Sequence, residues 1–160
     1  MAEPSPFLLS KCFSQLIGRK VTFGPTTPAM DPKIKQVFAI YNILPQEVAL
    51  VVRADLALLG SIGGALVGLP DAAVKEHIRA TPMDELMRDA ISEVLNIAAA
   101  SVTTEGRGVF VKMVTDPVYI DGAAEKAFKE PFRKNYFAVQ VEGYQGGKFA
   151  ILSSFVPTRL

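Results

Sequence analysis

Cysteine and histidine are almost absent from this sequence, since Cys12 and His77 are the only ones in 160 residues. A single cysteine excludes an intrachain disulfide and a zinc site built from cysteines. His77 lies in the charged segment VKEHIR, which is typical of a helix surface, so a Ser-His-Asp triad has little support. We expect Cys12, which lies in an apolar segment, to be a packing residue.

The chain also lacks an excess of charge and a long hydrophobic run. Lys and Arg total 17 and Asp and Glu total 16, for a formal net charge of +1, so no electrostatic argument favours nucleic acid or an anionic membrane surface. The longest apolar stretch, residues 56–69, is shorter than the roughly 20 residues that span a bilayer. The N-terminal stretch has no signal-peptide pattern. We therefore predict a cytoplasmic protein with no nucleic-acid or membrane partner.

The sequence does contain clear periodic segments, and 49% of its residues are hydrophobic, as in a globular chain. We expect residues 1–160 to form a single domain. Helical spacing and turn residues predict helices over 6–17, 54–70, 71–80 and 82–104, the last capped by Thr81. β-branched and aromatic residues predict strands over 20–24, 36–43, 47–53, 109–114, 136–144 and 148–156.

In this order of elements, a helix followed by strands occurs twice. That order predicts an α+β, two-layer fold in which two long helices pack on one mostly antiparallel sheet. It also suggests an internal pseudo-repeat. Gly60, Gly64 and Gly68 recur every four residues, which favours close helix packing over phosphate binding, because no Gly-Lys-Ser/Thr follows.

One narrow polar stripe interrupts the apolar pattern of the helix predicted over 82–104. At about 100° per residue, Glu93 lies roughly +40° and Asn96 roughly −20° from Asp89. A solvated face is the ordinary explanation for such a stripe. The small side chains that follow Asn96, including Ala100, would instead let a flat partner lie against it.

The spacing Asp89-x-x-x-Glu93-x-x-Asn96 resembles the motif of the CheC/CheX/FliY family of chemotaxis phosphatases. Pro117, in DPVYIDG, is similar to the proline that follows the motif in that family, and residues 6–24 and 54–70 are similar to CheX segments. The first predicted helix has no Glu-x-x-Asn pair, so the chain is most similar to CheX, which has one site. Ala100 stands where the family commonly has glycine.

The resemblance implies hydrolysis of the aspartyl phosphate of a CheY-like receiver domain. Asn96 would position the attacking water and Glu93 would pair with the receiver's lysine. Asp89, Ala100 and Pro117 would contact the partner. No metal or cofactor of the protein's own is implied, and Mg²⁺ is expected on the receiver.

The resemblance also implies a homodimer, which we expect to use an exposed sheet edge near residues 136–141 or 149–155. Two alternatives remain open. One is a non-catalytic binding or scaffold module of the same fold, and the other is a structural dimer whose polar stripe is only solvated.

Overall fold

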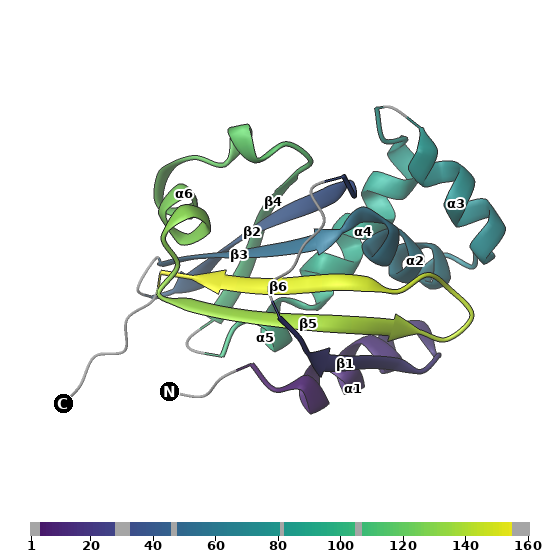
Figure 1. Ribbon diagram of the computed structural model, residues 1–160, viewed down its shortest axis with the longest axis horizontal. Coiled ribbons are helices and arrows are strands. Elements are labelled where there is room, and N and C mark those ends of the chain that lie inside the picture. Colours follow the sequence, from purple (N-terminus) through teal and green to yellow (C-terminus); the bar gives the residue numbers. More distant parts are fainter. Residues whose placement is uncertain (1–3, 28–32, 46–47, 81, 105–106, 155–160) are drawn as a thin grey trace.

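The computed structural model describes residues 4–27, 33–45, 48–80, 82–104 and 107–154 (Figure 1). The helices are α1 (Pro6–Ile17), α2 (Leu56–Leu66), α3 (Asp71–Arg79), α4 (Glu85–Ile97), α5 (Ala99–Val102) and α6 (Gly122–Lys129), with a 3₁₀ turn, η1 (Pro117–Tyr119). The strands are β1 (Val21–Pro25), β2 (Gln36–Leu44), β3 (Val48–Asp55), β4 (Arg107–Val114), β5 (Arg133–Val141) and β6 (Gly147–Ser153). Thr81, the predicted cap, lies outside the described residues.

The strands form one sheet in the order β1-β5-β6-β3-β2-β4, and all five pairings are antiparallel. The predicted α+β class is therefore confirmed. Exchanging β1 with β4, β2 with β5 and β3 with β6 turns this order into its own reverse. The topology thus has the twofold regularity that an internal pseudo-repeat requires, with α1 and α4 as the corresponding helices.

The sheet edges differ from those expected. Strands β5 and β6 each have a neighbour on both sides, so the expectation of an exposed edge near residues 136–141 or 149–155 was wrong. Among the strands that the structure describes, the free edges belong to β1 and β4. The alternation of apolar and polar residues along β5 and β6 indicates which face of the sheet each residue occupies, but not which strands pair. For this reason the edge strands could not be predicted from the sequence.

The main core lies between the sheet and the helices α1, α2, α4 and α5. Alternate residues of β2, such as Val37, Ala39 and Tyr41, enter this core, whereas Phe38 and Ile40 enter a second, smaller core under α6. Figure 1 shows α2, α3 and α4 gathered at one end of the sheet and α6 at the other. The site of interest therefore belongs to the larger helical layer.

Helix α1 matches its predicted bounds and is attached firmly to the sheet. Ser5 caps its start, and Gly18 ends it in the left-handed conformation at φ 68°. The Ser10 hydroxyl accepts from the backbone N–H of Phe23 at 2.9 Å, and Ser14 accepts from the N–H of Val21 at 2.9 Å. These bonds satisfy amides of the edge strand β1 and fix α1 over it.

Helix α2 places glycines where its backbone approaches α4. A Cβ added at Gly63 would lie 3.2 Å from the Cβ of Ala90 and 3.2 Å from the backbone nitrogen of Ile91. The equivalent atom at Gly60 would meet Ile78 and Met87. These glycines bring α2 close to α4 and α3, as the sequence predicted for Gly60 and also for Gly64, where a Cβ would meet Val74 of α3. The prediction was wrong for Gly68, which has no packing neighbour within 4 Å among the described residues and has φ 82° in the turn after α2.

Candidate functional site

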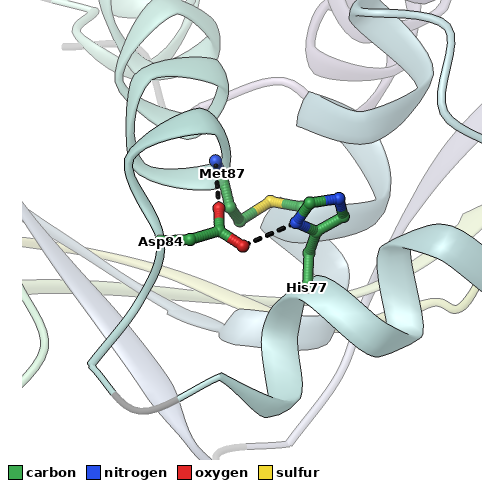
Figure 2. A network of polar contacts seen from close by, with 3 residues as sticks. All are labelled: His77, Asp84 and Met87. Atoms are coloured by element: carbon green, nitrogen blue, oxygen red, sulfur yellow. Dashed lines mark hydrogen bonds and ion pairs between the residues drawn. The ribbon is translucent and has the colours of Figure 1, made fainter.

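The helix that carries the polar stripe begins later than predicted, at Glu85, because Asp84 is its N-cap. One oxygen of the Asp84 carboxylate accepts from the backbone N–H of Met87 at 2.8 Å. The other lies 2.5 Å from Nδ1 of His77, at the end of α3 (Figure 2). The hydrogen bond from His77, and then that from Met87, lower the pKa of the Asp84 carboxyl below its ordinary value.

His77 thus has a structural part, as its charged context suggested. Its contact with Asp84 ties the end of α3 to the start of α4, and Figure 2 shows the carboxylate between the two helices. This pair fixes where α4 starts and therefore which residues its surface presents.

The two faces of α4 are cleanly separated. Met87, Ile91, Val94 and Leu95 are buried in the main core, and Ala90 is also buried. Asp89, Glu93 and Asn96 are exposed, so the structure places all three on the outer surface, as their helical spacing predicted.

None of these three side chains makes a hydrogen bond or ion pair with another described residue. One carboxamide and two carboxylates thus face solvent on a helix whose opposite face is buried in the main core. This is the arrangement that a site acting on a second protein needs: fixed position and unused hydrogen-bonding capacity.

The predicted helix 82–104 is interrupted one turn after Glu93, and a buried tyrosine explains why. The hydroxyl of Tyr41 on β2, which is 0% exposed, donates to the carbonyl oxygen of Leu95 at 2.6 Å. In a continuous helix that carbonyl would accept from the N–H of Ala99. Helix α4 ends at Ile97 and α5 begins at Ala99, so the bond lies at the break and next to Asn96.

Tyr41 is a residue that sequence reasoning missed. It stands in the apolar segment QVFAIYNI and reads there as another strand residue. The available signal was chemical, because a buried tyrosine hydroxyl needs a hydrogen-bond partner. Burial raises the pKa of this hydroxyl above its ordinary value, so it remains a neutral donor to the helix end.

The other two predicted partner-binding residues lie in different surroundings. Ala100 is exposed on α5, on the same helical layer as the stripe. Pro117 is exposed at the start of η1, and Ile120 just after it enters the core under α6, on the other side of the sheet. Ala100 therefore lies near Asn96 in the chain and in the same helical layer. A partner-binding surface that also includes Pro117 stays a prediction.

The described residues contain no group of three or more His, Cys, Asp and Glu side chains placed to hold a metal ion. Nor, within those same ranges, is any helix long and apolar enough to cross a membrane. The chemistry available at the stripe is that of one amide and two carboxylates.

Comparison with known proteins identifies the fold. No protein-family model matches the chain, and no curated protein sequence does. Among solved structures, it is similar to FliY of Thermotoga maritima, with a TM-score of 0.58 and 16% identity over 90% of this chain and 81% of that one. It is also similar to the FliM middle domain of H. pylori, with a TM-score of 0.53 and 12% identity over 92% of this chain and 84% of that one.

A chemotaxis protein CheX from Desulfovibrio desulfuricans matches with a TM-score of 0.43 and 15% identity over 92% of this chain and 93% of that one. The similarity to FliY confirms the fold that the resemblance to the CheC/CheX/FliY family implied.

Proposed function

We propose that this protein is a phosphatase that hydrolyses the aspartyl phosphate of a receiver domain. The observation that carries the proposal is the exposed Glu93–Asn96 pair on α4, whose side chains have no partner among the described residues. The spacing of the pair is that of the family the chain resembles, and the fold is shared with FliY.

The proposed chemistry rests on positioning. Hydrolysis of an acyl phosphate needs a water molecule in line with the leaving oxygen, and it needs little covalent help from the protein. The Asn96 carboxamide can accept a hydrogen bond from that water through its oxygen and donate through its nitrogen. A neutral amide also avoids the repulsion that a carboxylate would meet at a phosphoryl dianion.

Glu93, one turn before Asn96, would pair with the lysine of the receiver's phosphorylation site and so set the register of the two proteins. Asp89 would lie at the rim of this contact. The Mg²⁺ ion needed to offset phosphoryl charge is expected on the receiver, so this chain supplies no metal of its own.

The decisive experiment measures the lifetime of receiver phosphate with and without the protein. The Asn96→Ala variant should reduce the accelerated hydrolysis on the order of a hundredfold, because the water loses its positioning group. Asn42→Ala is the matched control, since Asn42 is an exposed asparagine on β2, away from α4. If the wild-type protein leaves the phosphate lifetime of every receiver from its host unchanged, the proposal is wrong.

A second candidate function is a binding module of the same fold. Its supporting observation is Ala100, an exposed residue that puts a methyl group where the family commonly has glycine. A methyl group there would hold a docked receiver slightly farther from Asn96. Tight receiver binding with an unchanged phosphate lifetime, in both the wild type and Ala100→Gly, would favour this function.

A homodimer is the third proposal, and it applies to either function. Within the described part of the chain, strand β4 is an edge of the sheet, and its Val109 and Val111 are 37% and 49% exposed. Exposed apolar edge strands favour pairing with another chain. Sedimentation of the purified protein at several concentrations distinguishes a dimer from a monomer.

A further inference from the structure

A groove of about 530 Å³ separates α1 from α5. Its lining residues are Ser5, Leu8, Lys11, Cys12, Gln15, Ala100, Ser101, Thr103 and Thr104. Leu8, Lys11 and Gln15 recur at helical spacing, so they form one stripe along the outer face of α1. The groove is therefore bounded by two helical walls, one apolar and cationic and the other small and hydroxyl-bearing.

None of the three stripe residues lines the groove, but one of its walls follows the stripe closely along the chain. Ala100 lines the groove and lies four residues after Asn96, on α5, just beyond the break at Ala98. Any globular protein that seats a phosphoryl group at Asn96 extends well beyond one side chain, since a specific interface covers roughly 800 Å² on each partner. A partner of that size has enough surface to contact the groove region as well as α4.

The charges of the two regions are opposite. Asp89 and Glu93 make the α4 stripe acidic, whereas Lys11 is the one charged side chain among the described residues that line the groove. A receiver's phosphorylation site carries both signs, because carboxylates hold its Mg²⁺ and a lysine lies beside the phosphoryl group. Charges arranged in this way fix the orientation of a partner as well as attracting it.

An exposed apolar side chain, Leu8, lines the same groove, and a second one precedes it in the chain. Leu8 is 57% exposed, and its neighbour Phe7 is 73% exposed. Burial of such exposed apolar side chains under a partner is energetically favourable. The groove thus combines an apolar contact with a single cation, which suits an acidic segment that also carries an apolar residue.

We propose that the α1–α5 groove is the second docking contact for the phosphorylated receiver, with Lys11 pairing with a receiver carboxylate and Leu8 covered by an apolar receiver side chain. This inference rests on the proposed function. Helix α1, the counterpart of α4 in the pseudo-repeat, would then contribute to receiver binding but not to hydrolysis.

Two measurements test the proposal. Lys11→Glu should raise the KM for the phosphorylated receiver roughly five- to tenfold with little change in kcat, because a rim charge acts on association. Lys126→Glu is the matched control, since Lys126 is an exposed lysine of a helix on the opposite side of the sheet, and its KM should be unchanged. Equal KM values for the two variants would overturn the groove assignment.

The second measurement uses the single cysteine as a reporter. Cys12 lines the groove and is partly exposed, so its alkylation by iodoacetamide reports access to the groove. A cysteine-free receiver loaded with Mg²⁺ and beryllofluoride should slow this alkylation several-fold, and Lys11→Glu should require more receiver for the same protection.

The outcomes separate the two proposals. If the receiver is dephosphorylated but Cys12 alkylation is unchanged, docking at the groove is refuted and the phosphatase proposal is not. Cys12 protection without turnover supports the groove and refutes catalysis. If the receiver neither protects Cys12 nor is dephosphorylated, both proposals are wrong.

Discussion

Replacing Tyr41 with phenylalanine tests whether the end of α4 is fixed from the sheet. The substitution keeps the ring in the core and removes only the hydroxyl, which donates to the Leu95 carbonyl at 2.6 Å. A hydrogen bond of this kind contributes about 0.5–1.5 kcal/mol, and the buried acceptor left behind adds to the cost. We expect Tyr41→Phe to lower the free energy of unfolding by about 1–2 kcal/mol.

Tyr144 provides a matched control for this variant. Its hydroxyl also donates to a backbone carbonyl at 2.6 Å, that of Leu69, but in the hairpin between β5 and β6 rather than beside α4. Tyr144 is only half-buried, so Tyr144→Phe should cost the same or somewhat less stability. Urea unfolding of the three proteins, analysed with a common m value, gives both differences.

The two variants should differ in activity. Tyr41→Phe frees the carbonyl next to Asn96 and allows α4 to continue toward Ala99, which would change the direction of the Asn96 side chain. We therefore expect a lower kcat for receiver dephosphorylation in Tyr41→Phe alone, with an unchanged KM. Unchanged stability of Tyr41→Phe, or an equal fall of kcat in both variants, would refute this reasoning.

Two further predictions concern the start of α4 and its packing. Asp84→Asn keeps a capping oxygen for Met87 but loses the charge opposite His77, so it should cost about 0.5–1 kcal/mol at neutral pH. The folded-state pKa of Asp84 is lowered, so the extra stability of the wild type over Asp84→Asn is fully present above the ordinary aspartate pKa of about 3.9. This difference in the free energy of unfolding disappears as the pH falls through the lowered pKa. A difference that grows on acidification to pH 2, measured by urea unfolding, would contradict the prediction. Gly63→Ala places a Cβ 3.2 Å from the backbone of Ala90, so it should lower stability by about 1 kcal/mol despite alanine's better helix propensity. Gly24→Ala, whose Cβ would lie 3.9 Å from the nearest backbone oxygen, is its control, and a stabilised Gly63→Ala would show that α4 can move away freely.

The sequence by itself determined the local elements and the composition of the stripe. Ser5 and Gly18 bound α1 through capping and a left-handed turn, which depend only on neighbouring residues. Helical geometry likewise placed Asp89, Glu93 and Asn96 on one face, because the rotation per residue is a property of the backbone.

Only the tertiary structure decided which strands are edges, where α4 ends and what adjoins the site. Strand order depends on pairings between segments far apart in the chain, for which β periodicity carries no signal. The break at Ala98 depends on Tyr41, which is 54 residues from Leu95, and the groove that Ala100 lines exists because α1 packs next to α5. These features arise from contacts between distant residues, whereas the stripe arises from neighbours, and that is why the sequence could predict the stripe and not its surroundings.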